Sequence, residues 1–310
     1  MASLRQIRQR LRSIQNTKQI MRAMQLVSGS KLKRSQAKLL QVRMVLEFLD
    51  GLRRRLLTEA GASSQDHPRA GRGARPPREG WTSHPLCAHR DAGPSALILF
   101  TSDAGLCGSY NTNLIQLAEA HLRRDAARST QLIFIGKKGH RYFTKRGYPA
   151  AEAYLDLAGR PDLAKAEAIA RRLMDRFLAG ELSSIHLLYS RFVSATTYRP
   201  MILPWLPVHV SPVTQSPSHP VTRGALEYIF EPSPQRVFDD LLPRWTLATF
   251  QRVMLEAFTS EHSARMIAMK NATDNAEEIL KTLTTQRNNV RQASITKELS
   301  EIVGTAEALK

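Results

Sequence analysis

Residues 3–57 read SLRQIRQRLRSIQNTKQIMRAMQLVSGSKLKRSQAKLLQVRMVLEFLDGLRRRLL. The stretch holds no proline and only two glycines, and its apolar residues recur at alternating steps of three and four. Such a narrow stripe predicts one long helix that packs against another helix. At ~1.5 Å per residue this helix would extend roughly 80 Å, so part of it is expected to project from a globular domain. The stripe is formed by Leu4, Ile7, Leu11, Ile14, Met21, Met24, Val27, Leu39, Val42, Leu46 and Leu49.

The same stretch is strongly basic. Residues 1–57 contain fourteen Lys and Arg against two acids, Glu47 and Asp50, and so supply +12 of the chain's net charge of +18. The sequence pI is about 10.5. A basic rod of this kind needs an anionic partner, which the charge alone leaves open among a nucleic acid, an anionic membrane surface and an acidic protein.

The bulk composition excludes several classes. Mean hydropathy is −0.31, and no run of about 18 apolar residues predicts a membrane-spanning helix. The N-terminal segment lacks the apolar core and cleavage site of a secretory signal. Cys87 and Cys107 are too few for a metal site or a disulfide scaffold. We therefore expect a reduced, cytosolic protein.

The middle of the chain changes character twice. Residues 61–95 are rich in Gly, Pro, Ser and Arg without any hydrophobic period, which predicts an exposed surface loop. Residues 96–230 then alternate between strand and helix patterns, which predicts an α/β sandwich with largely parallel strands. A second loop is predicted at 212–220. The expected strands are 96–101, 131–135, 184–191 and 201–210, and the expected helices are 111–127, 137–146 and 162–178.

A second long helix is expected from Ser233, which is a suitable N-cap before Pro234. Its pattern continues to about Leu309, and Pro243 is expected to kink or restart it. The predicted fold is α/β with long helices: an antiparallel coiled coil of the N- and C-terminal helices plus a central Rossmann-like α/β domain. The expected divisions are an N-terminal helix (1–60), a loop (61–95), the α/β domain (96–230) and a C-terminal helix (233–310).

Two motifs suggest chemistry, but neither predicts a catalytic site. Residues 136–139, Gly-Lys-Lys-Gly, follow a strand as phosphate loops do, yet they lack the P-loop spacing and its Ser or Thr. Cys107 stands in Gly-Leu-Cys-Gly, and none of the scattered histidines has an evident pairing with it. A buried structural thiol beside a glycine turn is the favoured interpretation. We predict no catalytic, cofactor-binding or metal-binding residue.

Several stretches resemble the γ subunits of F-type ATP synthases, in order and over essentially the whole chain. The stretches are 13–20 (SIQNTKQI), 23–28 (AMQLVS), 102–108 (SDAGLCG), 260–276 (SEHSARMIAMKNATDNA) and 291–303 (RQASITKELSEIV). The resemblance implies a central-stalk rotor, present in one copy, that transmits torque between the membrane c-ring and the catalytic β subunits. It implies the α, β and ε subunits and the c-ring as partners, no nucleic acid, no cofactor, and catalysis in β. It also implies a peripheral place on the cytoplasmic side of a bacterial inner membrane.

The resemblance also implies roles for individual residues. Arg291, Gln292 and Thr296 match residues that hydrogen-bond to β, and Met24 matches a position facing the same region. Arg265 matches a member of the coupling network, although an i,i+4 pair with Glu261 is an equally good interpretation. The motif implied for the foot of the stalk comprises Ser102, Asp103, Gly105, Leu106, Cys107 and Gly108.

The chain departs from the family pattern at four places. Ala104 replaces a basic residue, Ser109 and Tyr110 replace smaller or apolar residues, Pro243 stands early in the last helix, and the 61–95 loop is long. These departures suggest a divergent member. The alternatives to a rotor are a coiled-coil nucleic-acid binder, a membrane-surface amphipathic helix and an enzyme with an α/β nucleotide fold. The third is disfavoured because the chain lacks a phosphate loop. Aromatic residues make up only 6% of the chain, which disfavours the first, and the narrow apolar stripe disfavours the second.

Overall fold

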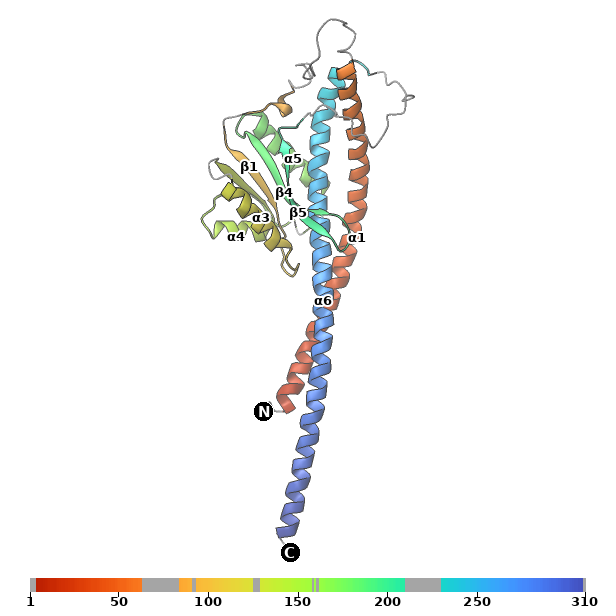
Figure 1. Ribbon diagram of the computed structural model, residues 1–310, viewed down its shortest axis with the longest axis vertical. Coiled ribbons are helices and arrows are strands. Elements are labelled where there is room, and N and C mark those ends of the chain that lie inside the picture. The colour runs from red at the N-terminus through yellow and green to blue at the C-terminus, as the bar shows by residue number, and fades with distance from the viewer. Residues whose placement is uncertain are drawn as a thin grey trace, which may run out of the picture. The chain divides into compact units, whose positions relative to one another are not determined.

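The computed structural model of this chain describes residues 4–62, 84–90, 93–124, 129–157, 159, 162–209 and 230–308 (Figure 1). They form two compact units. The sheet unit comprises Leu32–Gly105 and Ser109–Glu261, and the helical unit comprises Met1–Lys31, Leu106–Gly108 and His262–Lys310. The elements are α1 (Leu4–Ala62), the 3₁₀ helix η1 (Pro85–Cys87), β1 (Ser95–Phe100), α3 (Tyr110–Arg124), β2 (Thr130–Ile135), α4 (Lys137–Thr144), β3 (Ala150–Tyr154), α5 (Leu163–Leu178), β4 (Ser184–Phe192), β5 (Tyr198–Leu206) and α6 (Pro234–Ala308).

Five strands form one sheet in the order β3-β2-β1-β4-β5. The pairs β3–β2, β2–β1 and β1–β4 are parallel, and only β4–β5 is antiparallel. The prediction of a largely parallel α/β sheet is therefore confirmed. The sequence did not reveal β3, because its residues AAEAY lack a β-branched side chain and the strand is only half-buried.

Helices cover both faces of the sheet, and β1 is buried at all six positions. This explains why its sequence, SALILF, is an unbroken apolar run and not an alternating one. On one face the strands pack against α5 and against the parts of α1 and α6 within the sheet unit. The ring of Phe250 on α6 lies 5.8 Å from that of Phe100 and 5.1 Å from that of Trp205. Burial of each such side chain contributes about 1.5–3 kcal/mol.

In the sheet unit, α1 and α6 run antiparallel and are joined by polar contacts (Figure 1). Ser35 Oγ lies 2.6 Å from Thr259 Oγ1, a hydrogen bond that is fully buried. Further along, the indole Nε1 of Trp245 donates to Asp50 Oδ1 at 2.8 Å. The partners in each bond are about two hundred residues apart in sequence. The bonds therefore connect the first helical segment of the unit directly to its last.

The same antiparallel pairing occurs within the helical unit. Lys18 Nζ donates to Glu277 Oε2 at 3.1 Å, and this hydrogen bond lowers the pKa of the Glu277 carboxyl. A Cβ added at Gly29 would lie 3.5 Å from the Met266 sulfur, so the helices approach closely there. The predicted antiparallel pairing of the two long helices is confirmed.

The start of α6 agrees with the sequence, but its course through Pro243 does not. Ser233 Oγ accepts a hydrogen bond from Arg236 N at 3.3 Å, as expected of an N-cap. Pro243 lies inside α6, and the helix does not restart there. Proline removes one helical hydrogen bond, and the neighbouring turns offset this cost because Phe238, Leu242 and Phe250 are completely buried.

Most of the predicted loop at 61–95, and all of 212–220, lie outside the described residues. The described part of the first loop is not simply exposed, which corrects the expectation for residues 84–90. Leu86 in η1 is only 1% exposed and belongs to the core. Its backbone N–H donates to His84 Nδ1, and its carbonyl accepts from Val208 N at 2.8 Å. A short anchored turn therefore precedes β1.

Two glycine substitutions are expected to have opposite effects. A Cβ at Gly136, where φ is +104°, would lie 2.0 Å from the carbonyl oxygen of Thr101. Gly136→Ala is therefore expected to lower the free energy of unfolding by at least about 3 kcal/mol. Gly51, inside α1, has no atom within 4 Å of an added Cβ, so Gly51→Ala is expected to raise it by about 0.5–1 kcal/mol. Urea denaturation followed by circular dichroism measures both, and a tolerated Gly136→Ala would contradict this packing.

Candidate functional site

The first candidate region is the loop that follows β1, which begins the predicted foot motif. Ser102 N donates to Asn111 Oδ1 at 3.0 Å, and Ser102 Oγ donates to the carbonyl of Ala104 at 2.6 Å. Asp103 Oδ1 accepts hydrogen bonds from Lys137 N at 3.0 Å and from Asp156 N at 3.4 Å. These bonds connect the carboxyl ends of β1, β2 and β3. Ser102 and Asp103 therefore stabilise the loops at this edge of the sheet.

The remaining motif residues differ in exposure. Leu106 has a positive φ of 63° and is 60% exposed, whereas Cys107 is buried. Gly108 also has a positive φ, and an added Cβ there would lie 3.9 Å from the Cβ of Ala268. The thiol of Cys107 is thus covered, as expected of a structural cysteine. Burial raises the pKa of the other thiol, Cys87, to about 11, so it is not a thiolate at neutral pH.

The Gly-Lys-Lys-Gly motif does not form a phosphate cradle, because a side chain already occupies the start of α4. The carboxylate of Asp103 accepts the first backbone N–H of that helix, where a phosphate would bind. Lys137 forms an ion pair with Asp156, which raises the lysine pKa. Gly139 is closely packed, since an added Cβ would lie 3.0 Å from the Thr101 side chain. The glycines serve the packing of this turn.

A second place where ligands bind in such sheets is the crevice at the carboxyl ends of the strands where the strand order reverses. Here that point lies between β1 and β4. Tyr110 donates its hydroxyl to the carbonyl of Ala257 on α6 at 3.0 Å, and Ser260 Oγ on α6 donates to the carbonyl of Ser190 at 2.9 Å. The chain's own helix therefore covers this crevice.

The residues predicted to contact β fall into two groups. Arg265 is buried, with 8% of its surface exposed, and Met24 is half-buried. Arg291, Gln292 and Thr296 are all exposed, and the Thr296 hydroxyl donates to the Gln292 carbonyl at 2.9 Å. At ~1.5 Å per residue, Arg265 and Arg291 are about 40 Å apart along the helix. The structure does not bring the five residues into one cluster.

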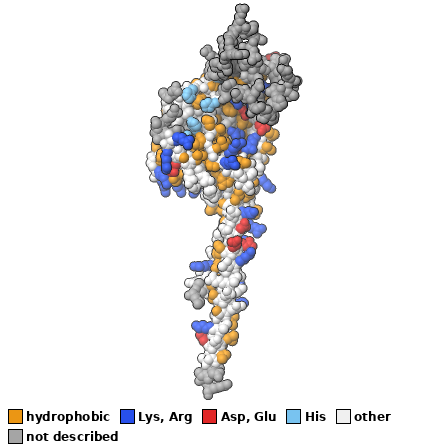
Figure 2. Space-filling model, viewed as in Figure 1, with side chains coloured by type: hydrophobic (Ala, Val, Ile, Leu, Met, Phe, Trp, Pro, Cys, Tyr) orange, Lys and Arg blue, Asp and Glu red, His pale blue; other side chains and the backbone are white. Residues whose placement is uncertain are grey.

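The structure adds an apolar stripe that the sequence reasoning did not assign to function. Every described side chain from residue 291 to residue 305 of α6 is exposed. Figure 2 shows hydrophobic side chains along this terminal segment. They are spaced at one helical face, a signal present in the sequence, and are between 48% and 63% exposed: Ile295, Leu299, Ile302 and Val303.

Other site types are absent from the parts of the chain that the structure describes. There, no group of three or more His, Cys, Asp or Glu side chains is arranged to hold a metal ion. No described helix combines the length and apolar character that crossing a membrane requires.

A family model described as ATP synthase matches residues 3–309. The chain belongs to this family. It is 37% identical to the ATP synthase gamma chain of Desulforamulus reducens over 311 residues, covering 100% of both chains. It is 38% identical to the gamma chain of Symbiobacterium thermophilum, covering 98% of this chain and 97% of that one. The resemblance to γ subunits noted in the sequence is therefore confirmed.

Solved structures show the same fold. The rotor of the Euglena gracilis mitochondrial ATP synthase matches with a TM-score of 0.59 at 15% identity, covering 94% of this chain and 98% of that one. The central stalk and c-ring structure of the Tetrahymena thermophila enzyme contains a chain that matches with a TM-score of 0.55 at 20% identity. That match covers 82% of this chain and 99% of the other.

The Asp103 contacts lead to a stability prediction. Asp103→Ala removes the acceptor at the start of α4 and is expected to lower the free energy of unfolding by about 1–2 kcal/mol. Asp103→Asn keeps an oxygen acceptor and is expected to cost less. Urea denaturation of both variants checks this, and equal losses would contradict the role assigned to the acceptor.

Proposed function

We propose that this chain is the central-stalk rotor of an F-type ATP synthase, a non-catalytic subunit that transmits torque to the catalytic β subunits. The observation that carries the proposal is the last part of α6, helical to Ala308 and exposed at every described side chain from residue 291 to residue 305. A helical segment without a packing partner is marginal in water. Such a segment suits a rotor tip that a surrounding ring of α and β subunits encloses.

The chemistry of this segment agrees with such a ring. Its apolar stripe offers a surface that a sleeve of partner subunits can cover, while Arg291, Gln292 and Thr296 offer polar contacts. Polar contacts of this kind would let the rotor turn without a fixed register. The exposed stripe indicates that apolar contact contributes as well.

Torque transmission requires a stiff shaft and a second point of engagement. Paired helices supply the stiffness, and Met24 and Arg265 lie in the region where α1 and α6 are paired. In this proposal residues 1–60 and 233–310 form the shaft and residues 96–230 form the foot. The foot, with Ser102–Gly108, would meet ε and the c-ring on the cytoplasmic side of a bacterial inner membrane. The basic α1 would attract acidic surfaces on the β subunits.

The assembly test uses the full chain with the α and β subunits encoded in the same genome. Co-expression is expected to yield one copy of this chain with a six-subunit ring, which native mass spectrometry measures, and sustained ATP hydrolysis. The preparation is washed at moderate salt to remove weak ionic binding. A chain that fails to associate and instead co-purifies with nucleic acid would overturn the proposal in favour of the basic-binder alternative.

The coupling test is a double variant in the exposed part of α6. Arg291→Ala with Gln292→Ala is expected to reduce ATP-driven proton pumping while the chain still folds and assembles, because both side chains are exposed. The matched control is Lys297→Ala with Glu301→Ala, which removes an exposed ion pair of 3.6 Å from the same segment.

Pumping is measured in membrane vesicles containing the assembled enzyme, with ATP hydrolysis recorded alongside. Normal pumping by the Arg291→Ala, Gln292→Ala enzyme would refute the assigned contacts. Equal losses in this variant and the control would show that the effect is not specific to these two residues.

A further inference from the structure

The sheet unit contains an open cavity of about 790 Å³ between α1, α6 and the β4–β5 pair. Four arginines, two tryptophans and three carboxylates line it: Arg43, Arg191, Arg199, Arg252, Trp205, Trp245, Glu47, Asp50 and Glu256. Asp50 already accepts from Trp245 and pairs with Arg53. Figure 2 shows basic side chains gathered on a face of the part of the molecule that holds the sheet. Neither the foot motif nor the predicted coupling residues line this cavity.

Two of the arginines face each other without compensation. Arg191 on β4 and Arg199 on β5 are directly opposite in the antiparallel ladder, so their side chains project from the same face of the sheet. Both are exposed. Within the described part of the chain, neither guanidinium forms an ion pair or a hydrogen bond. Like charges in this position repel each other, and an anion bound between them would remove that repulsion.

The floor of the cavity also has unused hydrogen-bonding groups. Arg43 and Arg252 both approach Glu256 Oε1, at 2.9 and 3.4 Å, and Glu256 is only 1% exposed. Its other oxygen, Oε2, has no partner among the described residues, and the same holds for Arg252 Nε and Thr249 Oγ1. Buried polar atoms almost always have partners, so these three atoms mark a polar site that is not satisfied by the chain itself.

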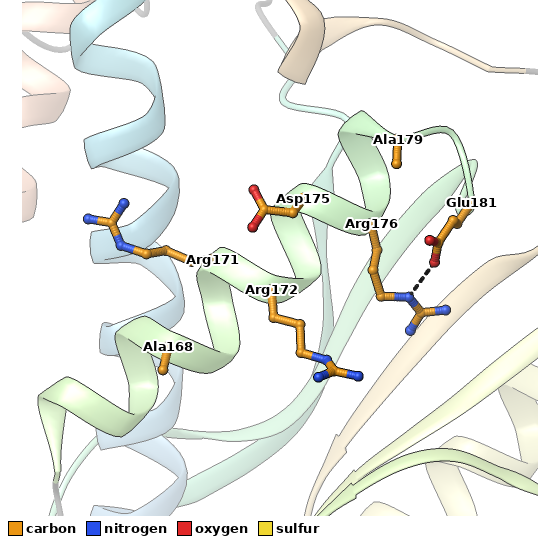
Figure 3. A pocket seen from close by; sticks show the side chains of 7 residues that line it. All are labelled: Ala168, Arg171, Arg172, Asp175, Arg176, Ala179 and Glu181. Atoms are coloured by element: carbon orange, nitrogen blue, oxygen red, sulfur yellow. Dashed lines mark hydrogen bonds and ion pairs between the residues drawn. The ribbon is translucent and has the colours of Figure 1, made fainter.

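A cluster of arginines does not by itself indicate an anion-binding site, and the arginines of α5 are an example (Figure 3). Three arginines line a shallow cavity of about 620 Å³ on that helix. Each is neutralised by a nearby carboxylate: Arg171 by Glu167 at 2.7 Å, Arg172 by Glu152 at 3.1 Å, and Arg176 by Glu152 at 3.0 Å and Glu181 at 2.8 Å. The α5 arginines are thus surface ion pairs, whereas Arg191 and Arg199 are not.

We propose that the cavity between α1, α6 and the β4–β5 pair binds a small phosphate-bearing ligand, with the phosphate held between Arg191 and Arg199. Arginine suits this role because its planar fork donates two hydrogen bonds to one oxyanion. The rest of the ligand would extend toward Thr249 and Glu256 with a hydroxyl or amino group. Trp205 and Trp245 provide its apolar wall. The proposal does not depend on the rotor function.

The test uses the full chain without α and β subunits and inorganic pyrophosphate as the probe. Isothermal titration calorimetry gives the Kd, and tryptophan fluorescence reports the cavity because Trp205 and Trp245 line it. The site variant is Arg191→Ala with Arg199→Ala. The matched control is Arg123→Ala with Arg124→Ala, which removes the same charge from exposed positions at the end of α3.

Pyrophosphate is expected to bind the unsubstituted chain and the control equally, and the site variant at least tenfold more weakly. If the unsubstituted chain, the control and the site variant all bind pyrophosphate equally, the binding is general charge attraction and the proposal is overturned. If none of the three binds pyrophosphate, the proposal is also overturned. Without ligand, the site variant is expected to unfold at the same or a higher temperature, because it loses a repulsion. A lower unfolding temperature together with lost binding would mean that the arginines are structural, and would also overturn it.

A second arm distinguishes a free phosphate compound from a lipid headgroup. The same three chains are mixed with vesicles of phosphatidylcholine containing phosphatidylglycerol, with and without pyrophosphate. Vesicle binding that weakens only in the site variant and is displaced by pyrophosphate supports a lipid phosphate in the cavity. Pyrophosphate binding that depends on the two arginines, with vesicle binding unaffected by them, supports a soluble ligand.

Discussion

The antiparallel pairing of α1 with α6 is the constraint on which the rest of this structure depends. Neither helix has enough apolar surface of its own to remain ordered as a single rod in water. The buried hydrogen bond between Ser35 and Thr259 and the bond from Trp245 to Asp50 fix the pairing within the sheet unit, and Lys18 with Glu277 fixes it within the helical unit. The α/β segment is inserted between these two helices, and its sheet also contacts α6 through Tyr110 and Ser190.

This pairing also changes what the sheet can do. In related α/β architectures the crevice at the strand-order reversal receives a ligand, but here α6 lies across it and is held by Tyr110 and Ser190. Tyr110 is one of the departures from the family pattern, and its buried hydroxyl makes a specific contact with the helix. The sheet thus serves as a support for α6.

How far the sequence predicts this structure depends on how local each feature is. The three-four stripe identified α1. Ile7, Leu11 and Leu39 are buried as predicted, but Val27, also placed in the stripe, is 55% exposed. The order of strands and helices was enough to give a parallel sheet. Asp103 at the start of α4, by contrast, depends on a contact between residues 34 positions apart, and no local pattern encodes it.

The arginine cavity was missed for a related reason. The predicted last strand began at residue 201, so Arg199 fell outside it. Pro200 lies within β5, and proline ordinarily argues against a strand, although an edge strand tolerates it. Only the observed register, with Arg191 opposite Arg199, brings the two charges together. Spacing in the sequence can suggest a hairpin, but which side chains share a face depends on a shift of one residue.

The uncovered end of α6 has a thermodynamic consequence. Helical turns that bury nothing open at low cost, so this end is expected to open more readily than the turns in which α1 and α6 are paired. Whatever encloses it binds the ordered form and shifts the equilibrium by mass action. The last turns are then more fully helical when a partner encloses them. In the free chain these turns fray, and assembly suppresses the fraying. Exchange of backbone amide hydrogens in these turns would therefore record, residue by residue, how much of the chain is engaged.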